Sequence, residues 1–353
     1  MGIVSTFLIA VVLIIGMVGC VPASQNLEIR NWYDLDAVRD EPYGHYILMN
    51  NLDSTTAGYE KLAGPIANQG KGWEPIWDFT GIFEGQGYEI RNLFISRLEE
   101  NYIGLFGFVY EGAVIKNLGV VDVSLTGRAY TGGVVGHNGY VGLGVPSEGG
   151  TVTNCYATGD VIGHNNVGGL AGFNVGTVTN CYATCNVTGL VSVGGLVGNN
   201  WDTVSNCYAT CSVTGEDVVG GLIGSTYQST VSNSCSSGNV TGEKGIGGLV
   251  GFNNQGTVYD SYSTGIVTGN FSIGGLVGDH HEGTVTNSFW DTETSEQATS
   301  AGGTGKTTAE MQDIATFSGA GWNIIAVGLN ETHLGYIWNI VNNVTYPFLS
   351  WQS

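Results

Sequence analysis

Side chains that could carry catalytic or metal chemistry are few in this sequence, and they lie far apart. His280-His281-Glu282 groups three potential metal ligands, but it lacks the His-Glu-x-x-His spacing that places two histidines on one helix face. Thr304-Gly305-Lys306-Thr307 has the end of a phosphate-binding loop, yet Ser300 replaces the first glycine of that motif. We therefore predict a solvated loop at the first run and no nucleotide site at the second.

Charge excludes several classes of partner. The chain has 30 acidic and 10 basic residues, a net charge of −20, and only Lys244 and Lys306 follow residue 128. Such a surface cannot neutralise a phosphate backbone, so nucleic acid is excluded as a partner. It also disfavours enzymes that bind uronate sugars through cations. Weak Ca²⁺ binding stays open at the acids expected near corners, which are Asp160, Glu216, Asp217, Asp279 and Glu282.

Aromatic residues form the most regular candidate surface. Tyr156, Tyr182, Tyr208 and Tyr262 each follow an asparagine or aspartate by two residues, at a spacing that is mostly 26 or 27. Strand alternation turns these rings outward if the preceding cysteines point inward. Two interpretations remain open. The rings form a ligand-contact strip for sugar rings, or they stack on one another and stabilise a sheet.

Cysteines follow the same spacing. Cys155, Cys181 and Cys207 share one repeat position, Cys185 and Cys211 share another, and Cys235 is displaced by one position. Neighbouring units would place their Cα atoms about 4.8 Å apart, within disulfide range but with strained geometry. We expect small, inward-facing packing residues, with bridging as the alternative.

Internal repeats account for these spacings. A Gly-Gly-apolar-apolar-Gly block begins at Gly132, Gly168, Gly194, Gly220, Gly247 and Gly274. A second block, typified by Thr151-Val-Thr-Asn-Cys-Tyr, recurs with it. Each unit offers three short β-prone runs and cannot bury enough apolar surface to fold alone, so neighbouring units must stack.

The sequence therefore predicts an all-β fold, a right-handed parallel β-helix with about 26–27 residues per coil. Two inward aliphatic columns are expected, one of leucines that includes Leu170 to Leu276 and one of valines from Val152 to Val285. Asn154, Asn180, Asn206, Asn233 and Asn287, with Asp260, should form a corner ladder in the left-handed conformation, with amides that can bond along the stack. Glycines are expected to turn the other corners with positive φ.

The repeated Gly-Gly-Leu-Val-Gly and Thr-Val-x-Asn-x-Tyr blocks resemble the GLUG-motif family of surface and secreted proteins over about residues 100–290. Trp73-Glu-Pro-Ile-Trp upstream and Ser288-Phe-Trp-Asp downstream resemble the flanking segments of such proteins. The resemblance implies a location at the cell surface and a role in adhesion.

The N-terminus is typical of an export signal. Ile3 to Val18 is almost wholly apolar, and Met17-Val18-Gly19-Cys20 resembles a bacterial lipobox, in which Cys20 would be lipidated. The alternative is an uncleaved membrane anchor or a cleaved signal. The predicted organisation is a signal or anchor at 1–20, an N-terminal cap at 21–100, repeats at 101–290, and a segment at 291–353 that covers the far end and contains a short helix at 307–317.

These observations predict an exported, membrane-tethered, non-enzymatic binding or adhesion module without a cofactor. Its expected partners are a surface glycan or protein, with Tyr156, Tyr182, Tyr208 and Tyr262 as the contact strip. Two alternatives are an extracellular polysaccharide-active enzyme, which would need carboxylates gathered in one groove, and a passive stalk or envelope component.

Overall fold

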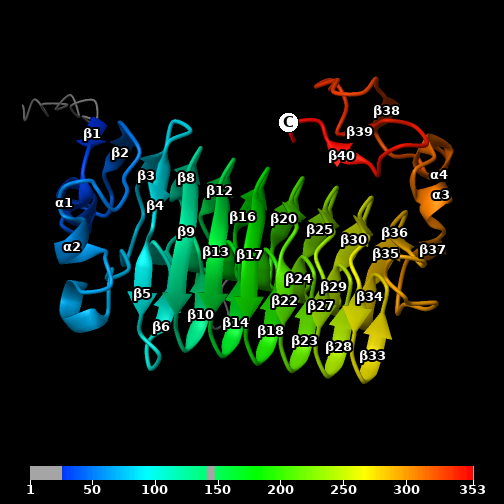
Figure 1. Ribbon diagram of the computed structural model, residues 1–353, viewed down its shortest axis with the longest axis horizontal. Helices are drawn as coiled ribbons and strands as arrows, with labels where there is room; N and C mark the ends of the chain where they lie inside the picture. Colours follow the sequence, from blue (N-terminus) through cyan, green and yellow to red (C-terminus); the bar gives the residue numbers. More distant parts are fainter. Residues whose placement is uncertain (1–25, 141–147, 353) are drawn as a thin grey trace, which may run out of the picture.

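The computed structural model describes residues 26–140 and 148–352, and it is an elongated parallel β-helix (Figure 1). One coil illustrates the path of the chain: β12 (Thr151–Thr153), β13 (Tyr156–Ile162), β14 (Asn165–Gly168) and β15 (Ala171–Asn174) follow one another around the core. Each strand pairs in parallel with its equivalents in the neighbouring coils, so four sheets run along the axis. The predicted β-helix is confirmed.

The four sheets are named here after the strands of that coil. The ten-stranded β12 sheet contains β1 (Asn26–Ile29), β2 (His45–Leu48), β3 (Ile82–Glu84), β8 (Val114–Lys116), β12, β16 (Thr177–Thr179), β20 (Thr203–Ser205), β25 (Thr230–Ser232), β30 (Thr257–Tyr259) and β35 (Thr284–Thr286). The thirteen-stranded β13 sheet contains β4 (Glu89–Arg91), β5 (Phe94–Ser96), β9 (Gly119–Thr126), β13, β17 (Tyr182–Thr188), β21 (Tyr208–Ala209), β22 (Ser212–Thr214), β26 (Cys235–Ser236), β27 (Val240–Thr241), β31 (Tyr262–Ser263), β32 (Val267–Thr268), β36 (Phe289–Asp291) and β37 (Thr304–Lys306).

The two remaining sheets have seven strands each. The β14 sheet contains β6 (Asn101–Ile103), β10 (Ala129–Gly132), β14, β18 (Val191–Gly194), β23 (Asp217–Gly220), β28 (Lys244–Gly247) and β33 (Phe271–Gly274). The β15 sheet contains β7 (Phe106–Val109), β11 (Val135–Asn138), β15, β19 (Val197–Asn200), β24 (Ile223–Tyr227), β29 (Val250–Asn254) and β34 (Val277–His281).

The coils stack in register, which confirms the predicted interior columns. Val152 pairs with Val178, and Val178 pairs with Val204. The leucine column, Leu170, Leu196, Leu222, Leu249 and Leu276, is fully buried. The valine column is fully buried from Val152 to Val258, whereas Val285 in the last coil is half-buried. Identical residues therefore pack on themselves along the core.

Each coil passes through four sheets rather than the three expected, because the glycine block contains the end of one strand, a turn and the start of the next strand. The sequence predicts positive φ at glycine corners, but the paired glycines do not adopt it. They allow the backbones of neighbouring coils to approach closely instead. A Cβ atom at Gly169 would lie 2.3 Å from the carbonyl oxygen of Gly195, and one at Gly195 would lie 2.1 Å from that of Gly221. Any larger residue would push neighbouring coils apart.

The asparagine corner is confirmed as a left-handed turn, with φ between 47° and 53° at its six residues, Asn154, Asn180, Asn206, Asn233, Asp260 and Asn287. Its amides do not form the expected bonded ladder throughout, although Asn154 Nδ2 donates to Asn117 Oδ1 at 2.9 Å. A bonded ladder lies inside the helix instead. There, Asn138 Nδ2 donates to Asn174 Oδ1, and Asn174 Nδ2 donates to Asn200 Oδ1, both at 2.8 Å.

The N-terminal cap closes one end of the helix with α1 (Trp32–Asp36), η1 (Ala37–Arg39), α2 (Tyr59–Leu62) and η2 (Ala67–Gly70). Trp32 and Trp73 are fully buried with their ring centroids 5.8 Å apart, and Arg39 lies over the Trp73 ring. This aromatic packing covers the apolar columns that the first coil would otherwise expose to water.

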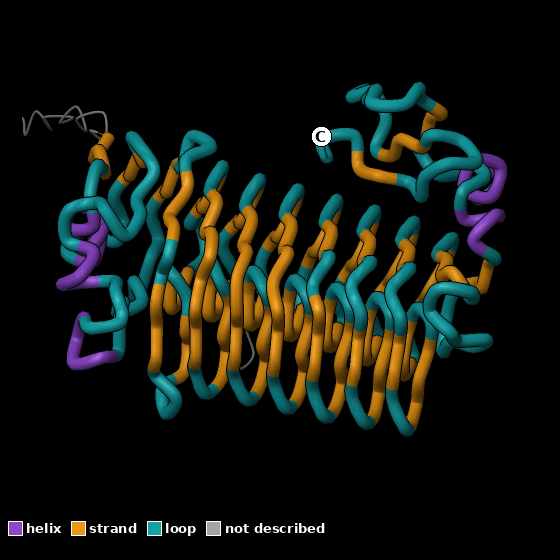
Figure 2. The backbone as a smooth tube through the Cα atoms, viewed as in Figure 1, coloured by secondary structure: helices purple, strands orange, loops and turns teal. Residues whose placement is uncertain are grey.

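The C-terminal segment differs from its predicted place. Residues 291–306 continue the coils, and β37 adds to the edge of the β13 sheet. The chain then turns back, so that residues 307–352 lie beside the last coils rather than only beyond them (Figure 2). This C-terminal lobe contains α3 (Thr308–Met311), α4 (Ile314–Gly319), β38 (Ile324–Ala326), β39 (Trp338–Ile340) and β40 (Phe348–Leu349). Two short helices thus replace the single helix expected at 307–317.

An aromatic column lies outside the β15 sheet. His137 stacks between Phe108 and Phe173, with ring centroids 4.7 Å apart on both sides. Its side chain is 8% exposed, and burial lowers its pKa to about 4. The imidazole is therefore neutral at pH 7.

We expect His137 to make the protein acid-sensitive. The unfolded state takes up a proton as the pH falls below about 6.5, whereas the folded state resists protonation until about pH 4. The stability is therefore full above pH 6.5 and falls between these values, by about 2 kcal/mol at pH 5. Urea unfolding of the wild type and of His137→Phe at pH 7 and pH 5 measures this. An equal loss of stability in both proteins would contradict it.

Candidate functional site

The tyrosine column begins successive strands of the β13 sheet. The rings of Tyr156 and Tyr182 have centroids 4.7 Å apart and planes 4° apart, and those of Tyr182 and Tyr208 are 4.8 Å and 2° apart. The rings point outward, as alternation predicts, and are half-buried. Because their planes are parallel at one coil spacing, each face of Tyr182 is covered by a neighbouring tyrosine. Ring edges and hydroxyl groups are what these residues present to solvent.

Tyr262 does not belong to an exposed strip, and that part of the prediction is wrong. Its ring is 6% exposed, and its hydroxyl donates to the carbonyl oxygen of Pro347 in the C-terminal lobe. Trp338 lies 5.7 Å from it, measured between ring centroids. Cys235 takes the tyrosine position in the intervening coil, between Tyr208 and Tyr262. The tyrosine column therefore packs against the C-terminal lobe at Tyr262.

The tyrosine hydroxyls are hydrogen-bond donors at neutral pH. Burial raises the pKa values of Tyr156, Tyr182 and Tyr208 above their usual range. The Tyr156 hydroxyl donates to the Glu89 carboxylate, which also raises its pKa. Tyr156 therefore combines ring stacking with a fixed hydroxyl hydrogen bond.

The C-terminal lobe has its own apolar core, centred on Phe317, Trp322 and Trp338. This core continues into Tyr262 and Phe289 of the coils. Asp291 holds the two parts together: its side chain is fully buried, and Oδ2 accepts from Thr308 Oγ1 and Tyr346 Oη at 2.7 Å. At the lobe's free end, Trp351 lies 5.6 Å from Tyr208 and 6.3 Å from Tyr182, between centroids.

A groove of about 290 Å³ separates the free end of the lobe from the asparagine corner. Its lining consists of Asn180, Asn206, Asn323, Leu334, Gly335, Tyr336, Ile337, Leu349, Ser350 and Trp351. This lining combines amides with aromatic and aliphatic side chains, and it includes no Asp, Glu, Lys, Arg or His. We call this feature the corner groove. Sequence analysis missed it because its two walls lie more than a hundred residues apart.

Two polar atoms at the corner groove lack partners. Asn206 Oδ1 and Trp351 Nε1 are buried, and neither has a hydrogen-bond partner within residues 26–140 and 148–352. Buried polar groups in folded proteins are nearly always bonded, to protein or to ordered water. Because neither atom has accessible surface, both are enclosed in the wall of the groove rather than open to an occupant.

The other candidates from the sequence do not assemble into a site. The His280 side chain packs against the interior position of the preceding coil, with Nδ1 3.1 Å from Asn253 Nδ2. Within the described ranges, no three His, Cys, Asp or Glu side chains are placed to hold a metal ion. Thr304–Lys306 is strand β37, and Thr307 caps α3, with Lys306 paired to Glu310.

The six cysteines from Cys155 to Cys235 are buried and unbridged, so the prediction of inward packing residues agrees with the structure. Burial raises the thiol pKa values of Cys155 and Cys181, which keeps both thiols protonated. Cys20, the predicted lipidation site, lies outside the described residues.

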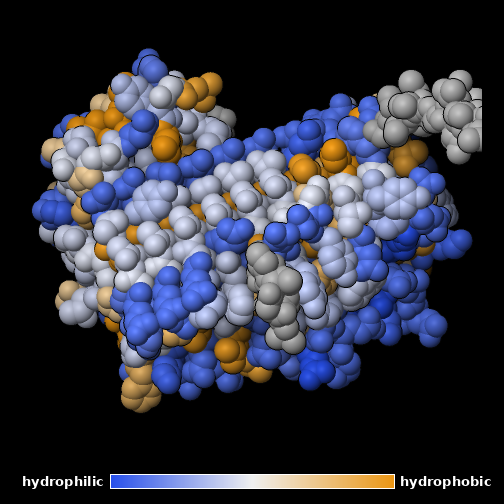
Figure 3. All heavy atoms as spheres, turned by 180° about the vertical axis from the view of Figure 1, so that it is seen from behind, coloured by the Kyte–Doolittle hydropathy of each residue, from blue (hydrophilic) through white to orange (hydrophobic). Residues whose placement is uncertain are grey.

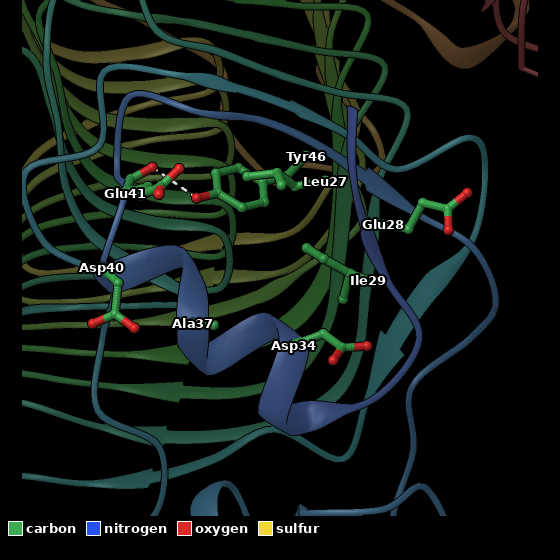
Figure 4. Close-up of a pocket in the computed structure, with 8 residues that line it drawn as sticks. All are labelled: Leu27, Glu28, Ile29, Asp34, Ala37, Asp40, Glu41 and Tyr46. Carbon is green, nitrogen blue, oxygen red and sulfur yellow. Dashed lines mark hydrogen bonds between the residues drawn. The ribbon is translucent and has the colours of Figure 1, made fainter. Parts of the chain in front are cut away.

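A second cavity, of about 320 Å³, lies at the N-terminal cap between β1 and α1 (Figure 4). Glu28, Asp34, Asp40 and Glu41 line it together with Tyr46. Their carboxylates point in different directions rather than toward one centre, and the Tyr46 hydroxyl donates to the carbonyl oxygen of Glu41 at 2.7 Å. The cavity therefore has the character of an acidic surface depression.

Comparison with known proteins identifies the repeats. Residues 127–162, 163–188 and 189–219 match the GLUG motif, in three consecutive copies. This segment of the chain is a run of GLUG repeats. The coils after residue 219 keep the same strand register, since Val219 pairs with Ile246 and Ile246 pairs with Ile273. Each GLUG repeat thus corresponds to one coil of the β-helix.

Two curated proteins are similar over part of the chain. Halomucin from Haloquadratum walsbyi is 34% identical over 175 residues, which is 45% of this chain and 2% of that protein. A candidate Gly-rich membrane protein from Evansella cellulosilytica is 38% identical over 114 residues, which is 30% of this chain and 12% of that protein. The chain therefore spans only a small part of the length of these relatives.

Solved structures share the fold. A candidate immunoglobulin A1 protease from Bacteroides ovatus aligns over 92% of both chains with a TM-score of 0.56 and 20% identity. A structure described as IgA1 protease aligns over 76% of this chain and 21% of that chain, with a TM-score of 0.51 and 16% identity. At these identities the likeness shows the β-helix alone. Among the described residues, no helix has the length and apolar character needed to cross a membrane.

Proposed function

We propose that this chain is a surface-displayed, non-enzymatic binding module that contacts a neutral glycan at the corner groove. The observation that carries the proposal is the chemistry of the lining, which pairs amides with aromatic rings and contains no Asp, Glu, Lys, Arg or His. Sugar hydroxyls bond to amides, and the apolar faces of sugar rings pack on aromatic side chains. The groove thus offers both kinds of contact at one place.

The position of the contact site differs from the tyrosine strip expected from sequence. Stacked tyrosines cover one another's faces, so Tyr182 has no free face for a sugar ring. In the corner groove, by contrast, Tyr336 is 36% exposed, and the neighbouring His333 ring lies at 78° to it rather than parallel, with ring centroids 5.2 Å apart. Tyr182 and Tyr208 support the groove by holding Trp351.

Charge supports a neutral or cationic ligand over an anionic one. The chain carries a net charge of −20, and its cations are concentrated before residue 129. Anionic polymers are therefore repelled at long range, more strongly at low salt. Figure 3 shows that a surface of intermediate hydropathy crosses the repeats on one face of the helix.

Surface display is supported by the apolar N-terminal run and by the names of the two curated relatives, a halomucin and a Gly-rich membrane protein. The proposed tether is a lipid on Cys20 or an uncleaved N-terminal anchor. A non-enzymatic role is supported by the lining of the groove, because glycoside hydrolysis requires a pair of carboxylates beside the sugar.

Binding of the full chain, in detergent, to an array of neutral, cationic and anionic glycans tests this proposal. We expect binding to neutral glycans, and a loss of affinity of about tenfold in Asn180→Ala and in Tyr336→Ala. The matched controls are Asn287→Ala, at the same left-handed corner beyond the groove, and Tyr43→Ala, an exposed ring of the N-terminal cap. These controls should bind like the wild type.

Circular dichroism of all four variants is the check that each one folds. Equal affinity in the groove variants and in the wild type would contradict the corner groove as the contact site. Absence of binding to every glycan would instead favour a passive stalk or envelope component.

A further inference from the structure

The corner groove has room for only a small part of a glycan chain. Its volume of about 290 Å³ lies at the lower end of the range of roughly 300–1,000 Å³ that is usual for small-molecule sites. One or two sugar residues therefore make most of the contacts, and the substituents on those residues decide which glycan is bound. The chemistry of the lining then indicates which substituent fits.

Side-chain amides at the groove are open to an occupant. Asn180 is half-buried, and its side chain makes no hydrogen bond among the described residues. Unlike Asn206 Oδ1, its polar atoms are not enclosed in the wall. Asn323, on the lobe side, is exposed, and its Oδ1 accepts from the N–H of Ile337 at 2.8 Å, which leaves Nδ2 as a donor. The groove therefore offers both an amide acceptor and amide donors.

An exposed aliphatic side chain accompanies these amides. Leu334 lines the groove and is 78% exposed, and Tyr336 follows it by two residues. An unsubstituted hexose has apolar faces that suit the Tyr336 ring, but the hydroxyl groups around its edge gain nothing from a leucine. A ligand that matches the whole lining therefore carries an apolar group beside its hydrogen-bonding groups.

From this combination we infer that the corner groove selects sugars that carry an acetamido group, the N-acetylhexosamines, over unsubstituted hexoses. The inference rests on the proposed function and names the substituent that the same site recognises. An acetamido group has an N–H donor, a carbonyl acceptor and a methyl group. The asparagine amides accept from its N–H and donate to its carbonyl, and Leu334 packs on its methyl group. Because the lining includes no Asp or Glu, a free amine in the same position gains no ion pair.

Calorimetric titration of the full chain, in a detergent without a sugar headgroup, tests this with ligands that differ only at the substituent. The first set is the β-1,4-linked tetramers of N-acetylglucosamine, glucosamine and glucose, and the second is the methyl glycosides of N-acetylgalactosamine and galactose. We expect the acetylated member of at least one set to bind about tenfold more tightly than the unsubstituted member, because the methyl contact and an amide hydrogen bond each contribute several-fold. In about 0.5 M salt, which screens attraction to the negative chain, the glucosamine tetramer should bind no better than the glucose tetramer.

Leu334→Ser isolates the methyl contact. It should reduce the acetamido preference from about tenfold to about threefold and leave affinity for the unsubstituted ligand within about twofold. The matched control is Leu329→Ser, which changes a leucine of the same lobe that is 70% exposed and lines a different groove. That control should keep the wild-type preference. An unchanged preference in Leu334→Ser would contradict the role of Leu334.

The outcomes separate this inference from the proposed function. Equal affinity within both sets, or tighter binding of array glycans that lack an acetamido group than of both acetylated ligands, would overturn acetamido selection. If Tyr336→Ala still weakens glycan binding in that case, the proposed function stands. Tighter binding of the glucosamine tetramer than of the acetylated tetramer would also overturn the inference, because charge would then select the ligand. Absence of binding to every neutral glycan would overturn both.

Discussion

Replacement of Asp291 by alanine is expected to release the C-terminal lobe from the coils. The buried carboxylate accepts four hydrogen bonds, from the backbone N–H groups of Glu293 and Thr294 and from the hydroxyls of Thr308 and Tyr346, at 2.7–3.1 Å. Its removal leaves those donors without their acceptor. Bonds to a charged group contribute about 1.5–3 kcal/mol each, and the losses overlap. We expect a destabilisation of about 4 kcal/mol.

The release can be measured separately from global unfolding. Trp322, Trp338 and Trp351 all lie in the lobe, so detachment should shift their fluorescence to longer wavelength and speed chymotrypsin cleavage after residue 307. The matched control is Asp160→Ala, which removes an exposed carboxylate that accepts one bond from Asn186. That control should change stability by less than about 0.5 kcal/mol. Wild-type protease resistance in Asp291→Ala would refute the proposed role of Asp291.

Replacement of Asn174 by alanine should cause a loss of similar size in the middle of the helix. The Asn174 amide is fully buried, accepts from Asn138 Nδ2 and the N–H of Gly176, and donates to Asn200 Oδ1 and the carbonyl oxygen of Gly176. Truncation leaves several buried polar atoms unpaired, at about 1–3 kcal/mol each before relaxation. We expect about 4 kcal/mol, read from the midpoint of urea unfolding.

A matched asparagine isolates this effect from residue type. Asn186 is exposed on the β13 sheet and makes one side-chain bond, to Asp160 Oδ1 at 2.8 Å. Asn186→Ala should unfold within about 0.5 kcal/mol of the wild type. If both asparagine variants lose the same stability, the interior ladder is not a principal support of the coils.

The repeat in the sequence determined the β-helix and its interior columns. A step of 26 or 27 residues brings Leu170, Leu196 and Leu222 onto one line, because parallel strands in register place equal repeat positions beside each other. The left-handed corner at Asn154 and its equivalents follows from the same repeat, since asparagine tolerates positive φ. Stacking of Tyr156, Tyr182 and Tyr208 follows as well, because their rings recur at the spacing of the coils.

Some features within the repeat could be recognised only in the folded structure. Glycines at Gly169 and Gly195 suggested positive φ, but the constraint on them is steric and comes from a carbonyl oxygen in the next coil. The asparagines at 174 and 200 were not distinguished by sequence from other polar residues of the repeat. Their bonded ladder depends on which side of the β15 sheet faces the core, and that is decided by packing.

Only the tertiary structure decided where residues 307–352 lie. This lobe has no repeat, so no column position relates it to the coils, and its place is fixed by contacts between distant residues, such as Tyr262 with Pro347 and Asp291 with Tyr346. Those contacts bury Tyr262, which the repeat pattern alone assigns to the exposed surface. They also bring Trp351 to Asn206 and so create the corner groove. The periodic part of the sequence determined the scaffold, whereas nonlocal apolar burial by the aperiodic part determined the candidate site.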